Sequence, residues 1–566
     1  MKRNYIFLLL SEIVCFWVLF LCFPYTIQMQ EGEDLFLLTR EFLGGVISRP
    51  QGITFLISDF LEQFFATAWV GALIYSLVIT LSQWLLFLTL RNLGKTSFGW
   101  LAFFPVLLVV PYSFPFVDMS VNFLFFSLLL YVFTAIKSKI WRTVYTLLLP
   151  IPAFCLMPWY EAVILLVVFV ILEYVYHKSK ITSAVILVPL AFSFFVPRLW
   201  SDFVDFVPFN KRPLTGIDEF FTWKVFVGYV ITCAAVLMPL KKKTAGWISC
   251  TASALCIAAF AAIMLTDKDL LFGERTNKLS LLADQKDWEG IIAEVPYDEA
   301  VKSKILTDYV LLAMSATDNL PQVLFSYPLS SPEDFLYRHD KRTFYTNFNR
   351  QFYDNIGIWD EAFHQAFEYG VTQRENECFR SLRFKIDYAL NSCDLGVARS
   401  YLELLQKSVC NGDFVKGRMH RLVALEAKSN RIKLPPYRGD TFVGAYPMPS
   451  ELFRLFERNV NSKKLLDYVL CSLLLNKEVE KFGIILSRFN LYKNSEMPRA
   501  YAEALTALAS RDPRARSIAG YNPDLEKYFA DFASKAKQNN GPGEYSNTYW
   551  AYLFFRQIEK PEEAAN

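Results

Sequence analysis

Hydrophobic residues are unevenly distributed along this chain of 566 residues. Residues 1–265 hold one apolar run after another, whereas from about residue 267 the sequence is mixed, charged and helical in its periodicity. A helix needs about 20 apolar residues to cross the hydrocarbon core of a membrane. The pattern therefore predicts an all-α chain in two parts. Residues 1–265 are expected to form a polytopic membrane domain, and residues 266–566 a soluble α-helical domain.

The apolar runs of the first part predict about nine transmembrane helices. They cover residues 5–24, 67–90, 98–113, 119–136, 142–158, 160–176, 182–197, 222–240 and 246–265. The third and seventh runs are short, so counts of eight and ten also fit. Lys2 and Arg3 before the first run resemble the start of a cleaved signal peptide. Because the run is long and no small-x-small site follows it, we expect an uncleaved membrane anchor.

The charges of the loops alternate in sign. Every second loop holds basic residues and no Asp or Glu. The basic residues are Lys2 and Arg3, Arg91 and Lys95, Lys137, Lys139 and Arg142, Lys178 and Lys180, and Lys241–Lys243. Acidic residues gather in the intervening loops. Since basic loops stay in the cytoplasm, we expect a multi-pass protein of the bacterial cytoplasmic (inner) membrane. Its N-terminus would be cytoplasmic and its C-terminal domain periplasmic.

The loop after the first run predicts two amphipathic helices within residues 34–65. They would cover residues 34–47 and 52–65, separated by the turn Arg49-Pro50-Gln51-Gly52. Aromatic apolar faces with few charges favour a position at the membrane–water interface. Packing against the transmembrane helices is the alternative.

The second part shows three helix–turn–helix patterns of similar shape. They begin at Leu282, Ala389 and Leu474, and each joins two apolar helix segments through a polar break of three residues. This arrangement resembles tetratricopeptide-type repeats, which stack helix pairs into a solenoid. Segments 326–358 and 430–448, rich in Pro, Gly and Tyr, are expected to be long connections.

Several classes of chemistry lack support in the sequence. No Cys/His spacing suits zinc, and no phosphate-binding loop or nucleophile motif is present. We expect no metal site, no cofactor and no nucleic acid partner. The cysteines outside the predicted membrane domain are equally compatible with disulfides and with free thiols, and they are Cys378, Cys393, Cys410 and Cys471.

Ionisable residues near a membrane are costly, so the place where they gather is informative. Glu31, Glu33 and Asp34 follow the first run directly, and Asp118 opens the fourth. Carboxylates beside basic residues at headgroup depth suit deprotonation of a hydroxyl next to a bound lipid phosphate. The candidate phosphate-binding residues are Arg49, Arg198 and Arg212. Acidic outer loops are also what any chain with basic inner loops would show.

The order of membrane span, acidic outer loop, two interfacial helices and further spans resembles the GT-C superfamily of membrane glycosyltransferases. The resemblance implies a polyprenyl-phosphate-linked sugar donor and a catalytic base early in the first outer loop. Asp34 is the first choice for that base, before Glu33, and Asp118 stands where a second acidic position is found. The chain departs from the superfamily in having fewer spans and no clear DxD motif.

Two hypotheses of different class follow. One is an enzyme that uses a lipid-linked sugar at the outer leaflet. The other is a non-catalytic membrane-anchored scaffold whose helical solenoid binds an envelope protein. A scaffold has no need of the Asp34 carboxylate, so this residue discriminates between them.

Overall fold

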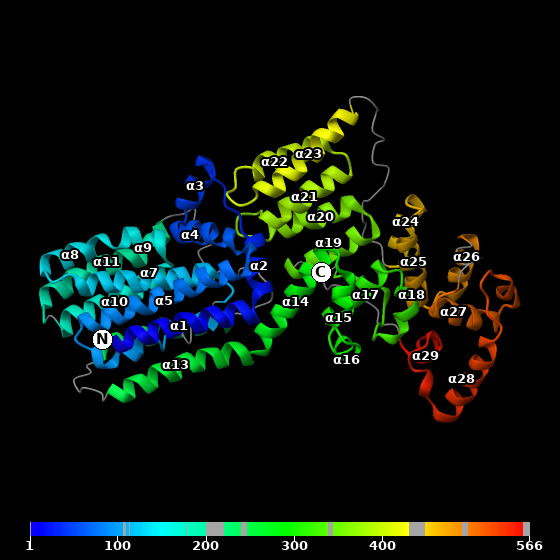
Figure 1. Cartoon of the computed structure of the whole chain (residues 1–566), viewed down its shortest axis with the longest axis horizontal. Coiled ribbons are helices and arrows are strands. Elements are labelled where there is room, and N and C mark those ends of the chain that lie inside the picture. The colour runs from blue at the N-terminus through cyan, green and yellow to red at the C-terminus, as the bar shows by residue number, and fades with distance from the viewer. Residues whose placement is uncertain are drawn as a thin grey trace. The chain divides into compact units, whose positions relative to one another are not determined.

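The structure is a computed structural model. It describes residues 2–105, 109–111, 114–176, 178–199, 220–238, 246–337, 343–429, 448–489 and 496–557. Within these ranges the chain is helical and contains no strand, as predicted (Figure 1). It forms two compact units. Unit 1 holds residues 1–277, 370–383 and 400–419, and unit 2 holds residues 278–369, 384–399 and 420–566.

The helices of unit 1 are mostly apolar and pack along one another. In chain order they are α1 (Lys2–Cys22), α2 (Pro24–Glu33), α3 (Arg40–Ile47), α4 (Gly52–Glu62), the 3-10 turn η1 (Gln63–Ala66), α5 (Ala68–Asn92), the 3-10 turn η2 (Thr96–Ala102), α7 (Val117–Ala135), α8 (Lys139–Leu148), α9 (Pro150–Leu156), α10 (Trp159–Val175), α11 (Lys180–Leu199), α12 (Phe220–Leu237) and α13 (Gly246–Thr266). Helix α5 lies between α1 and α7, and α10 packs against α11.

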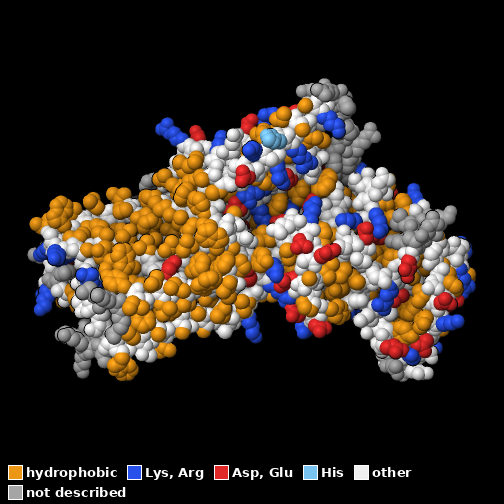
Figure 2. All heavy atoms as spheres, viewed as in Figure 1, with side chains coloured by type: hydrophobic (Ala, Val, Ile, Leu, Met, Phe, Trp, Pro, Cys, Tyr) orange, Lys and Arg blue, Asp and Glu red, His pale blue; other side chains and the backbone are white. Residues whose placement is uncertain are grey.

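Four of the described helices are long and apolar enough to cross a membrane. They are Asn4–Cys22 of α1, α5, α7 and α13. Their outer faces carry large exposed apolar side chains, including Leu21 and Trp247. Figure 2 shows hydrophobic side chains covering the visible face of these helices. Exposed apolar faces of this kind are compatible with a membrane location.

Two of the predicted single crossings differ in the structure. The described part of residues 98–113 is not one continuous helix: it holds most of the 3-10 turn η2, then residues 103–105 without helix, and helical residues 109–111. Residues 142–158 are divided between α8 and α9, since Pro150 opens a new helix. Proline lacks the N–H that an uninterrupted helix would use at this position. The described residues therefore support fewer continuous spans than the hydropathy pattern predicts.

Two carboxylates on the apolar helices of unit 1 have polar partners. The Arg142 guanidinium, predicted to lie in a cytoplasmic loop, is buried and forms an ion pair with Glu173 of α10. The Ser76 hydroxyl of α5 donates to the Glu12 carboxylate of α1 at 2.8 Å. These contacts explain how two carboxylates are tolerated on apolar helices, since buried charges need hydrogen-bonded partners.

The later helices are shorter than the long apolar helices of unit 1, and most of them are amphipathic. They are α14 (Lys268–Asp284), α15 (Trp288–Glu294), α16 (Tyr297–Ala300), α17 (Lys304–Ala316), α18 (Leu320–Val323), α19 (Thr343–Ile356), α20 (Trp359–Val371), α21 (Phe379–Asn391), α22 (Leu395–Leu405), α23 (Gly412–Ser429), α24 (Ser450–Arg458), α25 (Lys463–Leu475), α26 (Val479–Phe489), α27 (Arg499–Ala509), α28 (Leu525–Asn539) and α29 (Tyr549–Phe555). In unit 2, helices α24 to α28 pack in sequence, each against the next.

The three predicted helix–turn–helix patterns share one turn geometry. The middle residue of each break is left-handed, with φ of 61° at Lys286, 61° at Cys393 and 59° at Lys477. The residue after it donates its N–H five residues back, as Asp394 does to the Ala389 carbonyl at 2.8 Å. This is the Schellman ending of a helix. A fourth turn at Asp318, φ 61°, repeats it between α17 and α18.

Other expectations for the second part have mixed outcomes. Segment 326–358 was predicted to be a connection, but it contains helix α19, whose apolar positions Phe348 and Phe352 are buried. Most of the connection predicted at 430–448 lies outside the described residues. The cysteines are all free thiols, so the disulfide alternative is absent from the structure.

Candidate functional site

The acidic loop predicted from the sequence ends helix α2. Glu31 and Glu33 belong to its last turn, and Asp34 caps it with an extended backbone (φ −110°, ψ 166°). Residues 35–39 continue without helical structure until Thr39 caps α3, its hydroxyl accepting from the Phe42 N–H at 3.2 Å. The first predicted interfacial helix is therefore shorter than expected, and Asp34 lies outside it.

Helix α4 buries its polar side and exposes an apolar one. Thr54, Ser58, Asp59 and Glu62 are buried, and the Phe60 ring on another face is 40% exposed. The helix packs against α7 and α9. The sequence predicted that the apolar face lies at the membrane–water interface or packs against the transmembrane helices. The structure shows that the polar face carries two carboxylates, one turn apart, into unit 1.

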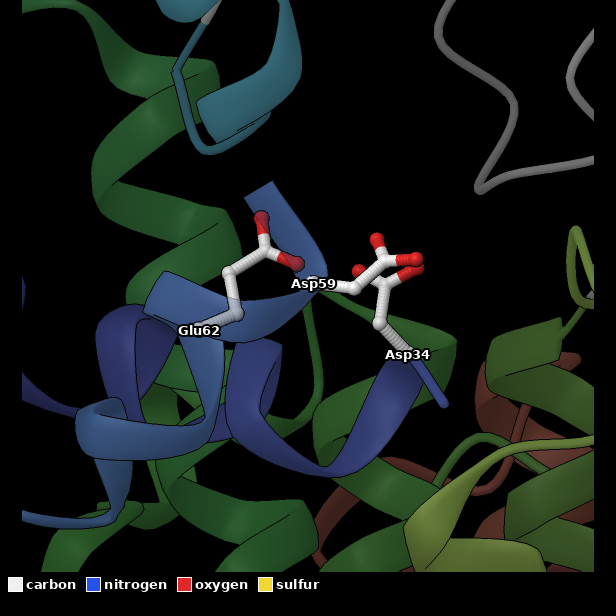
Figure 3. A group of neighbouring side chains, drawn as sticks. All are labelled: Asp34, Asp59 and Glu62. Atoms are coloured by element: carbon white, nitrogen blue, oxygen red, sulfur yellow. The ribbon is translucent and has the colours of Figure 1, made fainter. Parts of the chain in front are cut away.

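Four carboxylates meet where α2 ends and α4 packs on α7. We call Asp34, Asp59, Glu62 and Asp118 the acidic centre. Asp118 lies in the first turn of α7 and is buried. Oxygen atoms of Asp34, Asp59 and Glu62 lie within 4.8 Å of one another. Figure 3 shows these three side chains converging from α2 and α4.

One arginine neutralises part of this charge. Arg374, in the turn between α20 and α21, donates from Nη2 to Asp34 Oδ1 at 2.8 Å and to Asp59 Oδ1. Its Nη1 lies 3.7 Å from Asp118 Oδ2. The guanidinium also lies 4.4 Å from the centroid of the Phe55 ring, a cation–π contact. Arg374 thus links the acids that the sequence analysis selected, Asp34 and Asp118.

Burial dominates the electrostatics of the acidic centre. It raises the pKa of the Asp59 carboxyl well above its usual range, although the charge of Arg374 opposes the shift. It raises the pKa of Glu62 in the same way, with the negative charge of Asp34 adding to the effect. For Arg374, burial lowers the pKa, but Asp59, Asp34 and Asp118 together reverse this and the net shift is upward. The two buried acids favour their neutral forms.

The other acids of the loop have separate partners. Arg383 of α21 forms an ion pair with Glu31, with Nη1 2.9 Å from Oε2. Glu33 accepts from the Gln30 side chain at 3.2 Å and lies near the charge of Arg380. Burial raises the pKa of Glu33 to about 7, and Arg380 opposes the shift. Glu33, the second choice for a base, thus has Gln30 and Arg380 as its neighbours.

Of the three basic residues predicted to bind phosphate, the structure describes the side chain of Arg49. Arg49 pairs with Glu375 at 2.8 Å and its side chain is 48% exposed. Arg198 lies at the end of α11, but its side chain is not described, and Arg212 lies outside the described residues. Among the described side chains, Arg374 lies beside both Asp34 and Asp118.

Sequence reasoning missed Asp59, Glu62 and Arg374. The first two carried a usable signal: they are acids three residues apart in a helix with no other charge. Arg374 carried none, because 340 residues separate it from Asp34. Its place is set by the tertiary packing of segment 370–383 in unit 1.

Comparison with known proteins extends to the family level. No curated protein and no solved structure matches the chain at a significant level. A family model described as a family of unknown function, DUF6057, matches residues 2–556. Because the match covers nearly the whole sequence, both the apolar helices and the acidic centre fall inside it, and the chain belongs to this family of unknown function.

Proposed function

We propose that the chain is an enzyme of the bacterial inner membrane that transfers a sugar from a polyprenyl-phosphate-linked donor, in the manner of GT-C glycosyltransferases. The N-terminus would lie in the cytoplasm and the acidic centre at the outer leaflet. The later helices would form a periplasmic domain of tetratricopeptide-like repeats. The observation that carries the proposal is the shared contact of Asp34 and Asp118 with the Arg374 guanidinium.

Asp34 is the group best suited to act as a general base. Its side chain is 20% exposed, whereas Asp59 and Asp118 are nearly inaccessible. A base must come within about 3 Å of the proton it takes, directly or through one water. Among the acids of the centre, Asp34 can be approached by an acceptor hydroxyl.

The proposed reaction moves a proton to Asp34 and the sugar to the acceptor. Asp34 takes the proton of the acceptor hydroxyl as the hydroxyl oxygen attacks the anomeric carbon of the sugar. The bond between that carbon and the phosphate oxygen breaks, and the lipid phosphate leaves with the electron pair. Arg374 is the cation available to the phosphate, and guanidinium groups match phosphate geometry well.

The test is transfer of a labelled sugar by the purified full chain in liposomes. Synthetic polyprenyl-phosphate hexoses with a tritium-labelled sugar serve as donors, and label leaving the lipid phase is measured. Asp34→Asn keeps the shape and an acceptor for Arg374 but removes the base. We expect it to lower turnover at least about 100-fold.

Glu41→Gln is the matched control, because Glu41 is an exposed acid in α3 of the same loop. It should leave turnover unchanged. The proposal would be refuted if no hexose donor supported transfer and if Asp34→Asn released the same amount of label from the liposomes as the wild type.

A non-catalytic scaffold is the second candidate. The observation that favours it is the pairing of the loop acids with arginines of segment 370–383: Glu31 with Arg383, and Asp34 with Arg374. Such pairs hold two segments of one chain together without any chemistry. In that case the helical repeats would bind an envelope protein, and Asp34→Asn would leave that binding intact.

A further inference from the structure

The acidic centre holds more negative charge than its arginine can neutralise. Asp34, Asp59, Glu62 and Asp118 are four carboxylates, and Arg374 supplies one positive charge. Asp59 is 1% exposed and Glu62 is 3% exposed. Uncompensated buried charges are strongly unfavourable. The centre therefore requires either bound protons or a further cation.

Two buried oxygens remain available to such a cation. Asp59 Oδ2 and Glu62 Oε2 accept no hydrogen bond from any described residue. Arg374 uses the other Asp59 oxygen, Oδ1. A polar atom that is buried without a hydrogen bond is rare in a folded protein and needs an explanation. Here both atoms belong to acids on the same side of α4.

The spacing of the oxygens suits a single ion. Oxygens bound to one ion at about 2.1–2.6 Å lie at most about 4.2–5.2 Å apart. The ligand oxygens of Asp34, Asp59 and Glu62 are within 4.8 Å of one another. Asp34, one-fifth exposed, offers a route from solvent. An all-carboxylate ligand set suits hard ions such as Mg²⁺, Mn²⁺ and Ca²⁺.

We infer that Asp34, Asp59 and Glu62 bind one hard divalent metal ion. The ion would be held by the two acids of α4 from one side and by the acid at the end of α2 from the other, with Arg374 remaining on Asp34 and Asp59. This site was not expected from the sequence, which lacks a DxD motif. It goes beyond the proposed transferase activity and does not depend on it.

The probe is Mn²⁺ added to the metal-stripped full chain in detergent. Loss of the free-ion signal in electron paramagnetic resonance reports binding. We expect one bound Mn²⁺ per chain, displaced by excess Mg²⁺ or Ca²⁺. Glu62→Gln and Asp59→Asn should each weaken the affinity at least about tenfold, since even outer-shell changes at metal sites cost that much. Affinity should also fall as the pH is lowered, because protons compete for the carboxylates.

Glu12→Gln is the control, because Glu12 is an acid of α1 that accepts from Ser76 and lies outside the acidic centre. It should bind Mn²⁺ as the wild type does. The variants Glu62→Gln and Asp59→Asn must also be shown to fold. Their thermal midpoints are measured in chelator, where no metal is bound. A midpoint as high as that of the wild type means that a loss of Mn²⁺ binding is not a loss of folding.

The site and the transferase can fail separately. The metal site would be overturned if the wild-type chain bound no Mn²⁺, or if Glu62→Gln and Asp59→Asn bound Mn²⁺ as tightly as the wild type. Either result would favour protonated carboxyls. Sugar transfer by chelator-treated protein would then leave the transferase standing. Bound Mn²⁺ without transfer from any hexose donor would leave the metal site and remove the transferase.

Discussion

Replacement of Arg374 by alanine removes the cation that three carboxylates share. Asp59 and Asp118 are buried and would lose it entirely, whereas Asp34 is one-fifth exposed and can be hydrated. Breaking a buried ion pair from one side costs about 3–5 kcal/mol. Proton uptake by Asp59, whose pKa is already raised, limits the loss. We therefore expect Arg374→Ala to lower the free energy of unfolding by about 3 kcal/mol.

The matched control is Arg399→Ala. Arg399 pairs with Glu426 at 2.6 Å, but the two side chains are 44% and 33% exposed. Exposed pairs of this kind contribute about 0–1 kcal/mol. Thermal unfolding of the purified full chain in detergent, followed by tryptophan fluorescence, compares the two. We expect the midpoint to fall by at least about 5 °C for Arg374→Ala and by under about 3 °C for Arg399→Ala.

A double variant tests the stated cause. Asp59→Asn added to Arg374→Ala removes the carboxylate that was left without its cation. The double variant should therefore be more stable than Arg374→Ala by itself, a coupling expected of residues in direct contact. If Arg374→Ala is as mild as Arg399→Ala, or if Asp59→Asn lowers stability further, the account of the acidic centre is wrong.

Three more predictions concern single positions. The folded pKa of Glu33 is about 7, above the ordinary value of 4.5, so its stabilising contribution is complete below about pH 4 and is lost as the pH rises through 7. Glu33→Gln should reduce the pH dependence of the thermal midpoint over this window, and an unchanged profile would contradict the shift. Cys393→Gly should raise the free energy of unfolding by about 0.5–1 kcal/mol in denaturant titrations, because φ is 61° there, whereas Cys393→Ala should not. Gly71→Ala should lower the free energy of unfolding by about 1–3 kcal/mol, since the added Cβ would lie 2.4 Å from Ile27 Cγ2. Gly45→Ala should be neutral or stabilising, because the space around Gly45 is open. Equal effects of the two substitutions would argue against close packing at α5.

The helices of the second part were largely predictable because their signals are local. A period of 3.6 residues and a polar break of three residues both lie within one stretch of sequence, and they placed the turns at Lys286, Cys393 and Lys477. Helix α19 was missed because its Tyr and Asn residues resemble loop composition. Hydropathy joined α8 to α9 although Pro150 marks the break.

The acidic centre was predictable only in part. Asp34 and Asp118 were found because acids at the ends of apolar runs are costly and few. The buried side of α4 was misjudged, since an amphipathic pattern does not tell which face meets the protein when the surroundings are lipid. Arg374 depends on packing between segments far apart in sequence, which no local pattern reports.

A donor site at the acidic centre is tested most directly by mapping where a donor lipid binds. A polyprenyl-phosphate hexose with a photoreactive group beside the phosphate is activated in membranes containing the full chain, and labelled peptides are identified by mass spectrometry. We predict labels on residues 25–62 and on residues 370–383, reduced by unlabelled donor and by Arg374→Ala. Labelling confined to other segments, or unaffected by unlabelled donor, would contradict a donor site at the acidic centre.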